Sequence, residues 1–406
     1  MKRLRYGLAA AALLLILPFV PGLDSGFGRS LLSQMGIAAV FALSYHLLLG
    51  ETGLLSFGHA VYFGLGGYAS IHLLRAVNAG AWPIPIPFIP IAGLVAGLGF
   101  GLVFGALTTR RAGTIFALIS LGVGELIHAA SLMLPGFFGG EEGVTASRTR
   151  APAFLGFDFG SQIQVYYVIA FWLLASAFAI HAFLRTPVGR LCNAVRDNPE
   201  RVEFIGYNPQ RIRLIAFAAS AGFAGLAGGL HAINYEIVAA EALGAARSGA
   251  VLLMVYVGGA QHFLGAIVGA VVLTWLQVSL SDYTAAWLLY VGLFFMAIVL
   301  FAPAGLLGWI ALHVAMVRRG ETRRLLKAYA IAAAPAAAMS LGLVTLIEIA
   351  YRRSTQPEAG SRMRLLGILM DTSHAWPWLG AATFAIAGAL ALRAVWPRVS
   401  SAWSGA

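Results

Sequence analysis

The sequence has little of what most soluble enzymes rely on. Only 11% of its 406 residues are charged, and it contains one cysteine, Cys192. A single cysteine excludes an intramolecular disulfide framework. The two lysines, Lys2 and Lys327, follow Met1 and Leu326, so the sequence lacks the Gly-Lys-Ser/Thr element of a phosphate-binding loop. It also lacks the His-Glu-x-x-His pattern of zinc metalloproteases. ATP hydrolysis and proteolysis by these two mechanisms are therefore excluded.

Apolar residues and glycine are abundant instead. The chain is 60% hydrophobic, has a mean hydropathy of +0.83 and contains 48 glycines. Runs of about 20 apolar residues are long enough to cross a hydrocarbon layer about 30 Å thick as a helix. The fold class that this composition predicts is an all-α polytopic membrane protein, with about ten spans in the first three quarters of the chain. We place these spans near 7–22, 31–49, 60–78, 83–108, 113–134, 162–184, 212–235, 248–260, 263–281 and 285–302.

The charge distribution predicts an orientation. The net charge is +11, but the basic clusters lack the interleaved aromatic residues that stack on nucleic-acid bases. Counted along the ten spans, sixteen basic residues fall on the side of the N-terminus and five fall on the other side, namely Arg29, Arg75, Arg148, Arg150 and Arg247. Cytoplasmic loops retain the excess of arginine and lysine, so we expect a cytoplasmic N-terminus. The run at 248–260 is too short to cross and is expected to be tilted or partly re-entrant.

Glycine spacing predicts close helix packing. Gly93, Gly97, Gly101 and Gly105 recur every four residues and therefore share one helix face. Small residues at this spacing let helix backbones approach closely in a membrane, where lipid supplies no hydrophobic drive for association. The pattern predicts a packed bundle.

The stretch 56–70 resembles a dinucleotide-binding fingerprint, because Gly64, Gly66 and Ala69 satisfy the G-x-G-x-x-[GA] spacing. That fingerprint follows a strand, opens a helix and precedes an acidic residue about 20 positions later. Here the stretch lies between apolar runs, and the acidic position falls within the apolar, proline-rich segment 84–88. We interpret the glycines as membrane packing residues.

The longest polar interruption of the bundle, 185–211, contains paired helix signals. Thr186 and Asn198 each precede a proline, and Ser, Thr, Asn or Asp before proline is typical of a helix start. Gly206 suits the left-handed residue that ends a helix. We expect two short capped helices on the cytoplasmic side.

An apolar stripe follows the first of these helices. Leu191, Ala194 and Val195 have i, i+3, i+4 spacing. One interpretation is a docking surface for a partner protein, and the other is an amphipathic loop that rests on lipid headgroups.

Four segments together identify a family resemblance. They are 56–70, the run Gly122-Val123-Gly124-Glu125, the loop from Arg190 to Tyr207, and Phe301-Ala302-Pro303-Ala304-Gly305-Leu306. In this order they resemble the LivM-type inner-membrane permease of branched-chain amino acid ABC importers. The resemblance covers roughly residues 30 to 310, which defines a permease domain at 1–310.

The resemblance implies a non-catalytic transport subunit that carries branched-chain or other amino acids across a bacterial inner membrane and needs no cofactor of its own. It implies four kinds of partner: a related LivH-like permease, two cytoplasmic ABC ATPases, a periplasmic solute-binding protein and the lipid bilayer. Coupling to the ATPases is expected at Arg190, Leu191, Ala194, Val195, Arg196, Asn198 and Gly206.

Polar residues within the apolar spans indicate a translocation path, because each is costly in lipid and usually faces the bundle interior. Glu125 and His128 share a helix face and are candidates for a pair. Ser56, His59 and Gly64 belong to the glycine-rich stretch, where small residues leave room for a solute. The alternative for each is a structural hydrogen bond between helices.

Residues 311–406 depart from the family pattern. Two further apolar runs, 328–350 and 377–395, predict added spans, although Pro335 is a candidate break in the first. The sequence does not assign a role to this extension.

Two other classes of protein stay open at this point, a secondary transporter and an intramembrane enzyme, although an enzyme would need convergent catalytic groups. A secondary transporter would also be a glycine-rich bundle, but it typically shows matched halves, and no internal repeat is evident. Within the importer class, urea and short amides are alternative substrates.

Overall fold

The computed structural model describes residues 2–320, 322–355, 362–365 and 368–404. The chain divides into two compact units. Unit 1 comprises Met1–Ser279 and Leu293–Gly308, and unit 2 comprises Leu280–Gly292 and Trp309–Ala406. The last change of unit along the chain lies between Gly308 and Trp309, near the domain boundary that the sequence predicts at residue 310.

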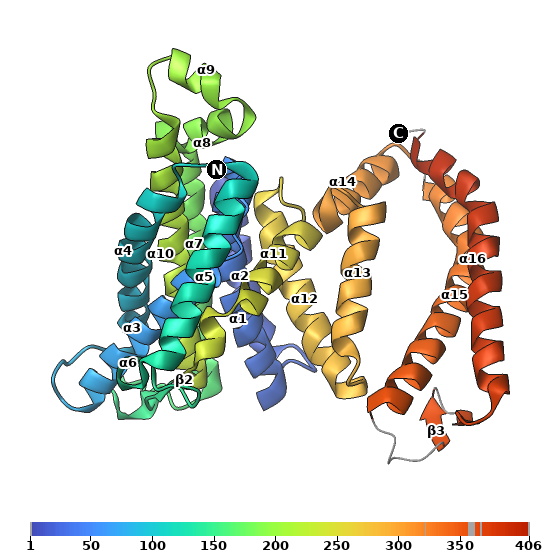
Figure 1. The fold of residues 1–406 in the computed structure, drawn as a ribbon, viewed down its shortest axis with the longest axis horizontal. Helices are drawn as coiled ribbons and strands as arrows, with labels where there is room; N and C mark the ends of the chain where they lie inside the picture. Colours follow the sequence, from blue (N-terminus) through green and yellow to red (C-terminus); the bar gives the residue numbers. More distant parts are fainter. Residues whose placement is uncertain (1, 321, 356–361, 366–367, 405–406) are drawn as a thin grey trace. The chain divides into compact units, whose positions relative to one another are not determined.

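Unit 1 is a helical bundle with very short strands at one end (Figure 1). Its helices and strands are α1 (Lys2–Ile16), α2 (Gly26–Thr52), α3 (Ala60–Asn78), α4 (Ile89–Thr108), α5 (Gly113–Met133), α6 (Pro135–Phe138), β1 (Val144–Thr145), α7 (Gln162–Arg185), α8 (Pro187–Asp197), α9 (Pro199–Phe204), α10 (Pro209–Tyr235), β2 (Ile237–Val238), the 3-10 turn η4 (Ala240–Leu243), α11 (Ala245–Gly258) and most of α12 (Phe263–Tyr283). Helix α13 (Trp287–Phe301) and helix α14 (Gly305–Arg318) each contribute residues to both units.

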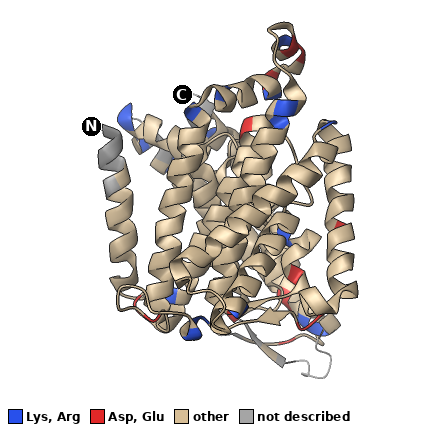
Figure 2. Cartoon of the chain, turned by 90° about the vertical axis from the view of Figure 1, so that its left-hand side faces the viewer, with Lys and Arg blue, Asp and Glu red and all other residues tan. Residues whose placement is uncertain are grey.

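The protein is a multi-pass membrane protein. Among the described residues, eight helices are long and apolar enough to cross a membrane, or up to nine if the bent pair α13 and α14 is one span. Six of the ten spans predicted before residue 310 coincide with such helices, namely α2, α4, α5, α7, α10 and α12, and the run at 285–302 belongs to the bent pair. The other three do not, because α3 is not among the candidate spans and α11 and the apolar part of α1 are too short. The two runs predicted after residue 310, 328–350 and 377–395, each lie in a helix long enough to cross. In unit 1 most charged residues lie toward the two ends of the helices (Figure 2). This distribution is expected of a bundle that crosses a hydrocarbon layer.

The predicted glycine face of α4 packs against α10. A Cβ atom added to Gly97 would lie 3.1 Å from the Cα of Gly225, and one added to Gly105 would lie 2.8 Å from the ring of Phe217. Gly66 of α3 also meets the backbone of Gly225. The core of unit 1 is thus a junction of α3, α4 and α10 that only small residues permit.

The segment 53–59 between α2 and α3 is irregular and mostly buried. Buried backbone needs hydrogen-bond partners, and helices α2, α5 and α11 supply them. The Tyr45 hydroxyl donates to the Ser56 carbonyl (2.9 Å), Ser120 Oγ accepts from the Phe57 amide (3.1 Å), and Ser248 Oγ accepts from the Ala60 amide (2.9 Å). The glycine-rich stretch is therefore a packed membrane element, as the sequence predicts.

The chain returns into unit 1 after α10. Strand β2 pairs antiparallel with β1 at one end of the bundle, and η4 and α11 then lead back toward the other end (Figure 1). Helix α11 has only 14 residues, and its first turn shares a cavity wall with Phe63 and Glu125, so it starts inside the bundle. This broken crossing agrees with the prediction of a partly re-entrant element at 248–260.

Unit 2 contains a helical hairpin. Helix α15 (Thr322–Thr355) continues through Pro335, so the predicted break is wrong, and it packs on α16 (Ala375–Ser404). Backbone contact at Gly342 and Gly388 lets the two helices approach closely. Strands β3 (Arg362–Leu365) and β4 (Ile368–Asp371) form an antiparallel pair between them, which the sequence analysis did not predict.

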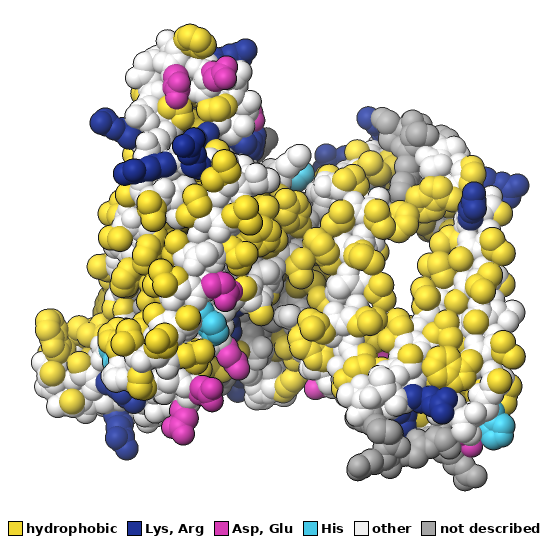
Figure 3. Space-filling view, in the orientation of Figure 1, with side chains coloured by type: hydrophobic (Ala, Val, Ile, Leu, Met, Phe, Trp, Pro, Cys, Tyr) yellow, Lys and Arg dark blue, Asp and Glu magenta, His cyan; other side chains and the backbone are white. Residues whose placement is uncertain are grey.

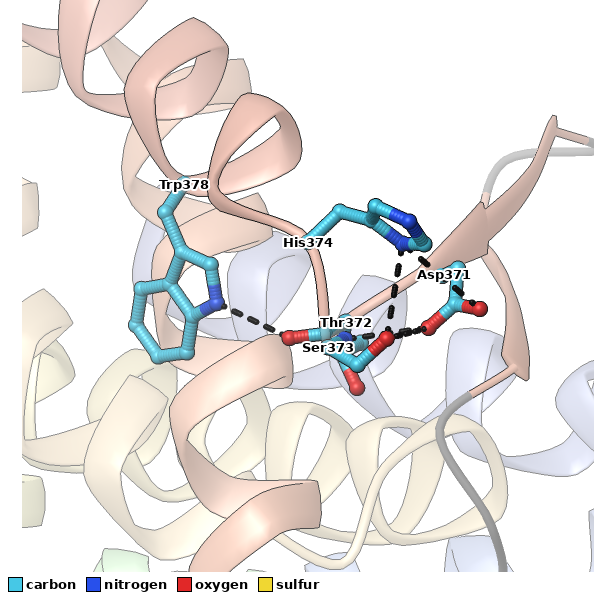
Figure 4. Close-up of polar contacts among 5 residues, drawn as sticks. All are labelled: Asp371, Thr372, Ser373, His374 and Trp378. Atoms are coloured by element: carbon cyan, nitrogen blue, oxygen red, sulfur yellow. Dashed lines mark hydrogen bonds and ion pairs between the residues drawn. The ribbon is translucent and has the colours of Figure 1, made fainter.

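A polar turn leads from β4 into α16 (Figure 4). Asp371 Oδ1 accepts hydrogen bonds from the Ser373 amide (3.0 Å) and hydroxyl (2.6 Å), and the Trp378 indole donates to the Thr372 carbonyl (3.2 Å). His374 Nδ1 lies 3.7 Å from the other carboxylate oxygen of Asp371. Ser373 Oγ also lies 3.4 Å from His374 Nδ1. Because the aspartate accepts from the amide two residues later and from the serine hydroxyl directly, the cluster is an Asx turn and lacks the order Ser–His–Asp of a catalytic relay.

Candidate functional site

A cavity of about 660 Å³ lies within unit 1, between α2, α3, α5, α10, η4, α11 and α12. Much of its wall is apolar, and the polar side chains on the wall are Gln34, Glu125, His128, His231, Tyr235, Glu241, Arg247, Thr274 and Gln277. Cavities of this size that combine an apolar wall with a few convergent polar groups are typical of small-molecule sites.

Arg247 is the basic residue of this wall. It lies in the first turn of α11, and its guanidinium carbon is 4.7 Å from the centroid of the Phe63 ring. His231 lies between aromatic neighbours, 5.4 Å from Phe63 and 4.5 Å from Tyr235 by ring centroids. The charge count places Arg247 outside the membrane, whereas in the structure it belongs to α11 and lines the cavity.

Two acidic residues face the same cavity from other elements. Glu125 comes from α5 and Glu241 from η4, and both side chains are accessible within the cavity. Figure 3 shows acidic side chains and a histidine gathered along the face that α5 presents. His128 Nδ1 contacts the carbonyl of Ala240 at 3.1 Å, and no ion pair between Glu125 and His128 occurs in the described part of the chain.

A second cavity, of about 710 Å³, opens at the β1–β2 end of unit 1. Its polar wall includes Arg75, Asn78, Ser147 and Arg150. Tyr235 lines both cavities, so the two are adjacent.

The remaining residues predicted for the path lie behind the cavity wall. Ser56 and His59 are fully buried, and His59 Nε2 is 3.0 Å from Ser44 Oγ. Gly64 packs on the side chain of Leu243. Their positions favour structural roles, while Glu125 and His128 line the cavity itself.

The loop between α7 and α10 folds as two short helices, α8 and α9. Thr186 Oγ1 accepts from the Gly189 amide (3.2 Å), and Asn198 Oδ1 accepts from the Arg201 amide (2.9 Å). Gly206 follows α9 with a φ of +92°. Both predicted N-caps and the left-handed glycine are confirmed.

The apolar stripe of α8 faces inward. Val195 and Cys192 are buried against Ile212 of α10, and Leu191 and Ala194 pack partly on the same cluster. Burial raises the pKa of the Cys192 thiol to about 12. The stripe therefore holds the loop to the bundle.

The exposed apolar residues of the loop lie at its tip instead. The exposed fractions are 90% for Phe204, 61% for Ile205 and 51% for Tyr207. The tip projects from one end of unit 1, and Arg190 is exposed nearer its base (Figure 1). Exposed aromatic residues at the end of a structured projection are typical of protein contact sites.

Helix α8 is also tied to the end of α2. Asn193 Nδ2 donates to Glu51 (2.7 Å), whose other carboxylate oxygen lies 3.4 Å from His46 Nε2. Arg196 donates to the carbonyl of Gly50. The loop is thereby linked to α2, which contributes Gln34 and other residues to the cavity wall.

The sequence analysis missed Arg247, Glu51 and Phe204 as functional candidates. Arg247 directly precedes the apolar run at 248–260, which is too short to cross the membrane. A basic residue at the start of such a short run was the feature of the sequence that could have indicated a position inside the bundle. The link of Glu51 to α8 joins residues more than 140 positions apart, so no local pattern reveals it.

Comparison with known proteins gives consistent matches. Residues 29–303 match the family described as branched-chain amino acid transport system / permease component. The high-affinity branched-chain amino acid transport system permease protein LivM of Salmonella typhimurium is 29% identical over 320 residues, which is 73% of each chain. LivM of Escherichia coli is 28% identical over 67% of this chain and 68% of its own length. The probable branched-chain amino acid transport permease protein LivH of Methanocaldococcus jannaschii is 25% identical over 62% of this chain and 79% of its own length.

No solved structure matches the chain significantly. The family match covers more than half of the chain, including the cavity and the α8–α9 loop. This chain therefore belongs to the permease component family of branched-chain amino acid ABC transport systems, whose members are non-catalytic transport subunits.

Proposed function

We propose that this chain is the LivM-like subunit of an ABC importer in a bacterial inner membrane. It pairs with a LivH-like permease, and the two together carry branched-chain or related amino acids along a path that includes the 660 Å³ cavity. The sequence has no phosphate-binding loop, so two cytoplasmic ATPases supply the energy. A periplasmic solute-binding protein delivers the substrate.

The observation that carries this proposal is the α8–α9 loop. Its caps give it a fixed shape, its inward stripe anchors it, and its tip presents Phe204, Ile205 and Tyr207. An exposed aromatic cluster of this kind suits a groove on an ATPase subunit. The tip replaces Leu191, Ala194 and Val195 as the expected contact, because those three residues face the protein's own core.

The orientation follows from the same loop. The N-terminus and the α8–α9 loop lie at one end of unit 1, and the β1–β2 pair lies at the other (Figure 1). Basic residues of the first end include Arg110, Arg185, Arg190 and Arg211. An excess of basic residues is typical of the cytoplasmic side, so the N-terminus is cytoplasmic and the 710 Å³ cavity is the periplasmic entrance.

The link through Glu51 provides a route for coupling. A movement of α8 is passed to the end of α2 by the bonds of Asn193 and Arg196, and α2 forms part of the cavity wall. Displacement of the loop by the ATPases therefore changes the shape of the cavity.

Co-purification tests the proposal. Phe204→Glu places a carboxylate where an apolar contact with the ATPase is expected, and burying that charge without a partner costs several kcal/mol. We expect the ATPases to be lost from the purified complex. Leu155→Glu is a matched control, since Leu155 is 81% exposed in the loop at the other end of unit 1. Full retention of the ATPases by Phe204→Glu would contradict the proposed docking surface.

A further inference from the structure

We propose that the 660 Å³ cavity binds an amino acid as a zwitterion, with Arg247 and the first turn of α11 holding the carboxylate, and Glu125 and Glu241 holding the ammonium group. This inference rests on the transport function proposed above, and it names the groups that recognise the substrate.

The carboxylate side is built around Arg247. Its side chain is largely enclosed by protein, and its guanidinium stacks on the face of Phe63. In the part of the chain that the structure describes, no hydrogen bond or ion pair engages this guanidinium. An arginine fork that is positioned by an aromatic ring and has free donors matches the geometry of a carboxylate.

The start of α11 adds donors to the same wall. Gly244, Ala245 and Ala246 line the cavity together with Arg247, and Gly244 has no side chain to cap the helix. The amides of Arg247 and Ser248 already donate to the Gly244 carbonyl (3.2 and 3.4 Å), so the amides of Ala245 and Ala246 are the donors left at the positive end of the helix dipole. Such an uncapped start inside a membrane bundle favours an anionic group.

The ammonium side lies on α5 and η4. Glu125 and Glu241 face the cavity that Arg247 faces, so groups of both signs surround one space. A simple anion would be repelled by the carboxylates, and a simple cation would be repelled by the guanidinium. A zwitterion satisfies both, and its net charge of zero lowers the cost of leaving water.

The rest of the wall suits an apolar side chain. Ile37, Val251 and Met254 line the cavity beside the polar groups. These residues offer dispersion contacts to an aliphatic chain, while they provide no partner for a polar one. The ligand class is therefore a small amino acid with an apolar side chain.

Photolabelling of the purified full-length chain tests the binding site directly. The probe is a diazirine analogue of leucine, with leucine and leucinamide as competitors. We expect labelling within the cavity that leucine displaces on the order of 100-fold more effectively than leucinamide, which lacks the carboxylate. Arg247→Gln should lower labelling by a similar factor, and Arg247→Lys, which keeps the charge but loses the fork, should lower it less.

Two further variants distinguish loss of the binding site from misfolding of the protein. Glu125→Gln changes an accessible side chain and should weaken competition by leucine. Arg110→Gln is a control for charge loss, because Arg110 is exposed just after α4 and its Nε donates to the Ala106 carbonyl (3.2 Å). Wild-type labelling and competition in both Arg247→Gln and Glu125→Gln would overturn the site, as would equal competition by leucinamide.

Uptake measurements separate the site from the proposed function. In cells that depend on this importer, loss of leucine uptake with Arg247→Gln, at unchanged amounts of assembled complex, supports the site. Normal uptake in that variant overturns the site and leaves the permease function standing. If labelling depends on Arg247 but deletion of the chain leaves all uptake unchanged, the site stands and the proposed transport function falls.

Discussion

Replacing Gly97 by alanine places a methyl group at the junction of α4 and α10. The added Cβ would lie 3.1 Å from both the carbonyl carbon of Ala221 and the Cα of Gly225, and closer still to the Ala221 carbonyl oxygen. Heavy atoms in ordinary contact are 3.4 Å or more apart, and the Ala221 carbonyl oxygen would be much closer than that, so the two helix backbones must move apart before the methyl group fits. Overpacking of this kind costs about 1–3 kcal/mol.

The same helix supplies the control. A Cβ added to Gly99 meets nothing within 4 Å. Gly99→Ala should therefore be neutral or stabilising by up to about 1 kcal/mol, because alanine favours the helix. Thermal unfolding in detergent, followed by intrinsic fluorescence, measures both variants.

We expect the midpoint of Gly97→Ala to fall by roughly 2–6 °C relative to Gly99→Ala, given the usual relation between free energy and unfolding temperature. If Gly97→Ala were as stable as Gly99→Ala, the close approach of α4 and α10 would be refuted.

Cysteines introduced singly at Ser147 and Gln210 should react with an impermeant reagent from opposite sides of the membrane, and labelling from one side would contradict the orientation. Native Cys192 should stay unlabelled in the folded protein at neutral pH, because it is buried and its pKa is raised to about 12; rapid labelling would contradict the packing of α8. Glu51→Ala should leave the Asn193 amide without its acceptor at a cost of about 1–3 kcal/mol and reduce uptake more than ATPase retention, whereas parallel loss of both would argue against a coupling route.

The bundle and its close contacts were predictable because they depend on local patterns. The glycines of α4 recur every four residues and therefore lie on one side of the helix. In a membrane, such a side allows the backbone of another helix to approach closely. The caps at Thr186 and Asn198 depend on two or three neighbouring residues, so sequence alone placed both helix starts.

The sequence predicted that α8 has an apolar side, but it did not predict what that side contacts. Leu191, Ala194 and Val195 form the predicted stripe, but periodicity does not say whether an apolar stripe meets a partner or the protein's own core. The cluster around Ile212 decides that question through contacts between α8 and α10. The contact candidate that we propose instead, Phe204, lies just beyond the periodic segment.

The location of Arg247 depended on counting crossings. The count treated 248–260 as a span and therefore assigned the preceding residues to an outer loop. The chain instead turns back through β2 and η4, so that α11 starts beside Glu125 and Phe63 in the cavity. Window hydropathy records composition and length, and it does not detect a helix that begins at mid-depth.

The central claim is that this chain transports amino acids only as part of an ATP-driven complex. The most direct test reconstitutes the chain with its partner permease, ATPases and binding protein in liposomes, and measures accumulation of radiolabelled leucine. The account predicts uptake that requires ATP and every component, and that Phe204→Glu abolishes. Accumulation of leucine by the isolated chain, driven by an ion gradient without ATP, would contradict it.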